Sequence, residues 1–104
     1  MSGKEWNEGL LIEIAGEKAH ALGRIAAHME RTLAALRDFD DGVVAVAGAP
    51  KLSREDLVAE AAEWVWYYVV QRDVLGWHRH EDALRAYDVP AEVIVRMGPR
   101  RRVR

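Results

Sequence analysis

The sequence predicts an all-α fold, a small helical bundle of one long, one intermediate and two short helices. Apolar residues recur every three or four positions along residues 9–40. Serine, proline and glycine signals divide the rest of the chain into three further helical segments, and the one strand-like run, Val43 to Val46, has no partner strand. A chain of 104 residues has room for one core, so we expect a single domain over 1–104, with flexible ends at 1–8 and 99–104.

The long helix is predicted over residues 9–40, and its apolar face consists of Leu11, Ile14, Leu22, Ile25, Met29, Leu33 and Leu36. The opposite face carries Glu13, Glu17, His20, Arg24, His28 and Arg31. Gly16 and Gly23 lie beside the apolar face. Because glycine costs roughly 1 kcal/mol relative to alanine inside a helix, we expect another helix to approach the backbone closely there. Gly42 ends the helix, and residues 42–52 form a linker loop.

The second helix is predicted to begin after Ser53, a good N-cap residue, and to end at Gly76. Its segment Trp64–Val70 is apolar on all sides; these residue types also favour strands, but the capped, alanine-rich segment before them favours a continuous helix. One layer of partner helix cannot cover such a segment, so we expect a second copy of the chain to do so. The predicted homodimer interface comprises Gly16, Gly23, Trp64, Trp66, Val70 and Trp77.

Two short helices are predicted in residues 80–98, over 80–87 and from Pro90 to Gly98. Their spacing allows a helix-turn-helix with Asp88 in the turn, where glycine is common. The internal apolar residues would be Ala83, Tyr87, Val89, Ile94 and Met97, and the outward residues of the second helix would be Ala91, Glu92, Val95 and Arg96.

Nucleic-acid binding by this segment is the alternative to simple closure of the bundle. Residues 1–77 hold eight basic and 13 acidic side chains, whereas residues 78–104 hold seven and four. The residues available for such contacts are Arg96, Arg100, Arg101, Arg102 and Arg104. An acid at Glu92 would repel phosphate, so we favour closure of the bundle and expect any nucleic-acid binding to be weak.

Metal and catalytic chemistry find little support in the sequence. Glu17 and His20 lie one helical turn apart, near Glu13, but a di-iron bundle needs a second such pair. His78, His80 and Glu81 could form only a weak surface chelate. The few hydroxyl nucleophiles are Ser2, Thr32 and Ser53, and no phosphate-binding loop is present. We therefore expect no metal, no cofactor and no enzymatic activity, leaving open a site between subunits that uses Lys18, Arg72 or Asp73.

Three further features bear on location and on buried polar groups. The chain has no cysteine, its start lacks the pattern of a secretory signal, and its longest apolar run is too short to span a bilayer. We expect a soluble, cytoplasmic protein without a membrane partner. Lys18, Gln71 and Arg72 interrupt otherwise apolar faces and are predicted to form a buried polar cluster.

Three segments carry a resemblance to a known group of proteins. They are residues 17–24 (EKAHALGR), residues 70–76 with VQRD and Gly76, and residues 86–98, from AYDVP to Met97-Gly98. Over roughly residues 10–98 the chain resembles a family of short alphaproteobacterial proteins with a domain of unknown function. The resemblance implies a helical domain and a bacterial source, and no activity. From the residues we expect a non-catalytic interaction or assembly module that works as a homodimer with an unidentified protein partner.

Overall fold

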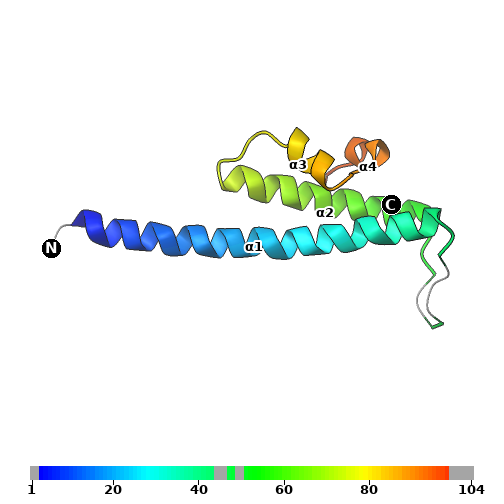
Figure 1. Ribbon diagram of the computed structural model, residues 1–104, viewed down its shortest axis with the longest axis horizontal. Helices are drawn as coiled ribbons and strands as arrows, with labels where there is room; N and C mark the ends of the chain where they lie inside the picture. Colours follow the sequence, from blue (N-terminus) through cyan, green and yellow to red (C-terminus); the bar gives the residue numbers. More distant parts are fainter. Residues whose placement is uncertain (1–2, 44–46, 49–50, 99–104) are drawn as a thin grey trace, which may run out of the picture.

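The computed structural model describes residues 3–43, 47–48 and 51–98 of the chain. Within these residues it contains four α-helices and no strand (Figure 1). The helices are α1 (Gly3–Asp40), α2 (Arg54–Val74), α3 (Glu81–Ala86) and α4 (Ala91–Val95). The predicted all-α fold of one long, one intermediate and two short helices is confirmed.

Helix α1 begins at Gly3, six residues before the predicted start, and ends at Asp40. Gly42 follows with φ +73°, a left-handed conformation that glycine adopts without strain, so it ends the helix as expected. Val43 lies outside any regular element. The rest of the strand-like run, residues 44–46, lies outside the described part of the chain, as do residues 49–50 of the predicted linker.

Helix α2 is capped by hydrogen bonds at both ends. At its start the Ser53 hydroxyl accepts a hydrogen bond from the Asp56 N–H at 3.1 Å, and the Asp56 carboxylate accepts one from the Ser53 N–H at 3.4 Å. This capping box satisfies two backbone donors that the first turn leaves without a partner. At its end Gly76 has φ +85°, and the Trp77 N–H turns back to the Arg72 carbonyl at 2.9 Å. The chain therefore reverses within three residues of the helix end.

The core forms where α1 and α2 lie side by side and antiparallel, with α4 against α2 (Figure 1). Helix α3 reaches this core through the half-buried Ala83 and Leu84. It includes three residues of the predicted α1 stripe, and the stripe residues Leu22 and Ile25 are half-buried against it. The buried core residues are Met29, Leu33, Leu36, Leu57, Val58, Ala61, Ala62, Val65, Tyr68 and Val93. Helix α2 supplies six of these ten, so it is the central element of the fold.

The molecule is elongated because α1 is much longer than the helix beside it. Its extents are 62 × 32 × 29 Å and its radius of gyration is 17.6 Å, whereas a compact domain of this length has about 13 Å. The Gln71 side-chain amide meets the Lys18 backbone carbonyl at 3.4 Å, which marks where the end of α2 reaches α1. Residues 3–17 run on past this contact for about 22 Å, at 1.5 Å per residue, with no other described helix beside them (Figure 1). We call residues 3–17 the α1 extension.

Candidate functional site

Exposed apolar side chains gather at the C-terminal end of α2. Trp66, Val70 and Val74 are spaced four residues apart and so share one side of the helix, and Trp77 follows in the reversal. Val70 is 39% exposed, and Val74 and Trp77 are each 52% exposed. We call these four residues the α2-end surface. Three of them belong to the predicted interface, to which the structure adds Val74.

The two glycines of the predicted interface face open space. Apart from the chain neighbours and the adjacent backbone of α1 itself, no described atom lies within 4 Å of the position that a Cβ would take at Gly16 or at Gly23. The expectation that a helix passes close to them is therefore not met within one chain. Both residues lie on the exposed side of α1, where their backbone is accessible to another molecule.

Trp64 packs differently from the other tryptophans. Its ring stacks on the His28 ring, with centroids 4.3 Å apart and planes at 12°, and Tyr67 meets it edge-on at 5.3 Å. The sequence placed His28 on the polar face of α1, and His28 is indeed exposed. The stacking partner was missed because it lies in another helix, 36 positions along the chain. Of the predicted interface, Trp64 is thus largely committed to contacts within its own chain.

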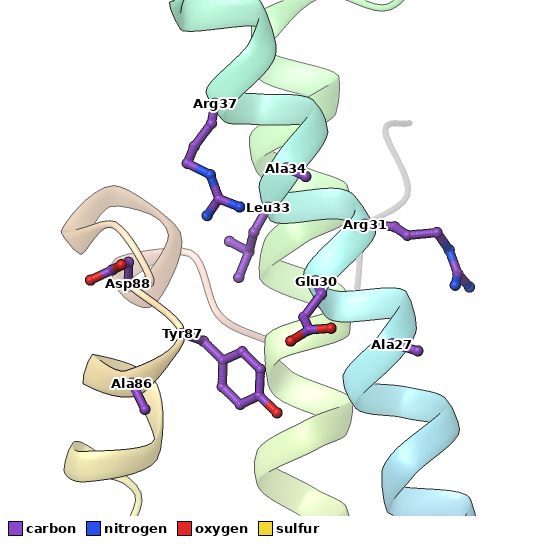
Figure 2. A pocket seen from close by; sticks show the side chains of 9 residues that line it. All are labelled: Ala27, Glu30, Arg31, Leu33, Ala34, Arg37, Ala86, Tyr87 and Asp88. Carbon is purple, nitrogen blue, oxygen red and sulfur yellow. The ribbon is translucent and has the colours of Figure 1, made fainter.

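A groove of about 610 Å³ lies between α1 and the turn that joins α3 to α4. Its lining residues are Ala27, Glu30, Arg31, Leu33, Ala34, Arg37, Ala86, Tyr87 and Asp88. Figure 2 shows the Tyr87 ring and the Leu33 side chain pointing into the space, with Glu30 and Arg37 beside it on α1. Burial and the nearby Tyr68 raise the pKa of Tyr87 above its ordinary value. The groove therefore combines an aromatic surface, which stays a neutral phenol at physiological pH, with charges of both signs.

A network around Arg54 joins three helices. The Arg54 guanidinium donates through Nε to Asp40 Oδ1 at 2.7 Å and through Nη1 to Glu92 Oε2 at 3.0 Å, and its Nη2 reaches the other oxygen of each carboxylate. The end of α1, the start of α2 and the first turn of α4 thus meet at one side chain. Hydrogen bonds from Arg54 lower the pKa of both Asp40 and Glu92. Arginine suits this role because its planar group binds two carboxylates in bidentate fashion.

The predicted helix-turn-helix segment folds as two short helices with one change of register. Ala83, Tyr87, Val89 and Met97 pack against the core as predicted, and the turn residue Asp88 adopts φ +52°. The prediction is wrong at Ile94, which is 38% exposed, because the neighbouring Val93 is the fully buried residue of α4.

The two charged outward residues of α4 are engaged with α2, whereas Val95 is 84% exposed. Glu92 binds Arg54, and the Arg96 guanidinium lies 3.4 Å from Glu55 Oε1. Both partners come from the first turn of α2, so α4 turns its charged side toward its own chain. The remaining predicted nucleic-acid contacts, Arg100, Arg101, Arg102 and Arg104, lie outside the described residues.

The predicted buried cluster of Lys18, Gln71 and Arg72 does not form. Among residues 16–43, 47–48 and 51–98, no polar or charged side chain is buried, and Lys18, Gln71 and Arg72 are each half-buried. Gln71 binds only the Lys18 backbone, and Arg72 instead joins the chain reversal after α2. There Arg72 Nε donates to His80 Nδ1 at 3.2 Å, and Arg72 Nη2 donates to the Arg79 carbonyl at 2.9 Å.

The two histidines proposed as a surface chelate meet a different acid from the predicted one. His78 Nδ1 and His80 Nε2 lie 3.1 Å and 2.9 Å from Asp73 Oδ1, which replaces Glu81 in the group. Hydrogen bonds from His78 and then His80 lower the pKa of Asp73. Within the described residues, no group of three histidine, aspartate or glutamate side chains is arranged to hold a metal ion.

Glu17 and His20, the other residues considered for a metal, are exposed, as predicted. No described helix is long and apolar enough to cross a membrane.

These features define an elongated all-α protein with apolar and grooved surfaces. The chain belongs to a family of unknown function, DUF6665, whose model matches residues 7–103. The match confirms a domain of unknown function over nearly the whole chain and names no lineage, so the alphaproteobacterial source stays a prediction. No curated protein and no solved structure matches the chain, so no activity carries over from a relative.

Proposed function

We propose that the protein is a non-catalytic assembly module that works as a homodimer, joined through the α1 extension and the α2-end surface. The observation that carries the proposal is the α1 extension, a helical segment that no other described part of the chain covers. An isolated helix of 12–15 residues is marginally stable in water, and most helices in proteins depend on packing of an apolar face. In the sequence, the apolar stripe continues into the extension at Leu11 and Ile14.

The α1 extension of a second copy has the right length to cover this surface. Two extensions packed antiparallel about a two-fold axis would overlap over residues 3–17, so the start of one α1 would reach Lys18 of the other. That is the position where α2 ends along α1, as the contact of Gln71 shows. The partner's helix would therefore continue the second layer of the bundle at the point where α2 stops.

The α2-end surface supports the same arrangement. Val70 and Val74 are exposed within one turn of Gln71, and so beside the junction that the partner helix would reach. Aromatic residues such as Trp66 and Trp77 are enriched in interfaces, and obligate dimers bury surfaces that resemble a domain core. One copy would thus cover both the unpartnered helix and the exposed apolar residues of the other.

The test is the mass of the protein in solution, measured by light scattering after size exclusion. We expect twice the 11.8 kDa of one chain for the native protein, and one chain for Val74→Glu, because a buried carboxylate without a partner opposes association. Val95→Glu is the matched control, since Val95 is 84% exposed on α4, away from the proposed interface, and this variant should remain a dimer. A native protein that runs as a monomer at tens of micromolar would refute the proposal.

Weak nucleic-acid binding remains the alternative proposal. It rests on the basic excess of residues 78–104, while the pairing of Glu92 with Arg54 and of Arg96 with Glu55 weighs against it. Fluorescence anisotropy with a labelled duplex at low salt tests it. Binding that weakens when residues 100–104 are deleted, with a shallower salt dependence, would support the alternative, and no binding would end it.

A further inference from the structure

The reversal between α2 and α3 gathers four side chains that can exchange or respond to protons. Arg72 and Asp73 come from the last turn of α2, His78 from the connection, and His80 from the N-cap position of α3. Gly76 makes the gathering possible, because its φ of +85° turns the chain back on the end of α2. The Gly76 N–H binds the Asp73 carbonyl at 2.9 Å and fixes the same turn.

The hydrogen bonds determine which ring nitrogens carry hydrogen. An ionised carboxylate only accepts hydrogen bonds, so both ring nitrogens beside Asp73, Nδ1 of His78 and Nε2 of His80, must be donors. Arginine only donates, so His80 Nδ1, which receives the Arg72 Nε–H, must be without hydrogen. In this hydrogen-bonded arrangement His80 is therefore the Nε2–H tautomer, and its Nδ1 accepts from Arg72.

Arg72 uses its contact with His80 to hold the start of α3. Its Nη2 donates to the carbonyl of Arg79, the residue before the N-cap. Its guanidinium also lies over the Tyr68 ring at 5.8 Å and over the Trp77 ring at 5.4 Å. The side chain of His80 is 17% exposed, so most of its ring is enclosed by these neighbours.

We propose that these four residues form a proton-operated latch, in which a proton on His80 Nδ1 breaks the contact with Arg72 and releases the start of α3. A proton there would place an N–H directly against the Arg72 Nε–H, and two cations would face each other. Imidazole is the side chain that ordinarily changes charge between pH 5 and 8.

The charges around His80 act in both directions. Asp73 of α2 and the first-turn acids of α3, Glu81 and Asp82, favour a positive ring. Arg72 of α2 and Arg79 of the connection oppose it, and His78 opposes it once charged. His80 keeps Asp73 as a partner in either state, whereas Arg72 Nε loses its acceptor on protonation and only the bond from Arg72 Nη2 to the Arg79 carbonyl remains. Release of Arg72 is therefore the structural consequence of acidification.

The latch also reaches the α2-end surface through Trp77, which loses the stacked guanidinium when Arg72 moves. This step alone rests on the proposed function. If it holds, the dimer dissociates more readily at pH 5.5 than at pH 7.5. The tautomer and the release of α3 are measured independently of association, on the Val74→Glu monomer if required.

The experiment is nuclear magnetic resonance of the histidine rings together with amide hydrogen exchange at pH 7.5 and 5.5. We expect the Nε2–H tautomer for His80 and a protonated Nδ1 for His78 at pH 7.5. At pH 5.5 we expect protection factors of residues 84–87, whose amides bond to the first turn of α3, to fall several-fold, while those of residues 57–68 stay unchanged. An Nδ1–H tautomer for His80, or equal protection of residues 84–87 at both pH values, would overturn the latch.

Two variants separate the latch from general loss of structure. His80→Gln should remove most of the pH response because glutamine does not titrate in this range, and the exposed His20→Gln should leave it intact. Arg72→Met should give low protection of residues 84–87 already at pH 7.5, with little further change at pH 5.5. A full pH response in His80→Gln would assign the effect to another group and contradict the proposal.

Discussion

At the scale of single residues, Arg54 makes the widest set of contacts between helices. It joins carboxylates that lie 14 and 38 positions away, and it does so at the surface, with 41% of its side chain exposed. Isolated surface ion pairs contribute little to stability, but one guanidinium bound bidentately by two carboxylates forms a network with defined geometry. We therefore expect Arg54 to matter more than its exposure suggests.

The stability that Arg54 provides should depend on pH in a defined direction. Its partners have a lowered pKa in the folded protein, so their contribution is present above the ordinary values of 3.8 for Asp40 and 4.5 for Glu92 and is lost as the pH falls below them. Arg54→Met should lower the melting temperature at pH 7, and the difference from the native protein should shrink towards zero on acidification below these values.

Thermal unfolding followed by circular dichroism between pH 3 and pH 7 measures this difference. Arg85→Met is the control, because the ion pair of Arg85 with the exposed Asp82 lies within one turn of α3 and joins no other helix of the described chain. A difference between native and Arg54→Met proteins that persists unchanged at pH 3 would show that Arg54 acts by packing rather than by charge.

At the scale of elements, the turn between α3 and α4 depends on one residue in an unfavourable conformation. Asp88 has φ +52°, in the left-handed region. That backbone conformation costs most residues with a side chain about 1–2 kcal/mol of folding free energy, and it costs aspartate less. Asp88→Gly should therefore stabilise the protein slightly, and Asp88→Ala should destabilise it by up to about 1 kcal/mol. Urea unfolding gives both values, and equal effects of the two variants would contradict the argument.

The helix boundaries were readable from the sequence where a local signal exists. Ser53 caps α2, and Gly42 and Gly76 terminate the two long helices in left-handed conformations, because capping depends on residues within one turn of the helix end. Helix α4 has five residues, too few for helical periodicity to separate Val93 from Ile94. The exchange of these two residues follows from packing on α2, which the sequence does not specify.

The candidate surfaces were readable only in part, for the same reason. The exposure of Val70 follows from an excess of apolar side chains on one helix, and that of Trp77 from its place just after the end of the same helix. The joining of Asp73 to two histidines depends on the path of the chain after Gly76, and the groove at Tyr87 depends on how α3 lies relative to α1. Neither leaves a local pattern, so sequence reasoning found the residues without their partners.

At the scale of the whole molecule, the elongated shape gives a prediction that is independent of mass. Small-angle X-ray scattering of the Val74→Glu variant, which we expect to be a monomer, should give a radius of gyration near 17.6 Å, with hydration adding slightly to it. A value near the 13 Å of a compact domain would mean that the α1 extension folds back in solution. Removal of residues 3–14 should lower the radius and also abolish association.

The α1 extension has a consequence for how the protein could select its partners. If two copies join along this segment, their Tyr87 grooves stand on separate bodies at a spacing set by a stiff helix. A partner with two matching epitopes at that spacing would gain avidity, because its second binding event occurs at a high effective concentration. A partner with a single epitope would gain nothing. The length of one helix would then set the distance between the two grooves, and with it the partners that can bind both at once.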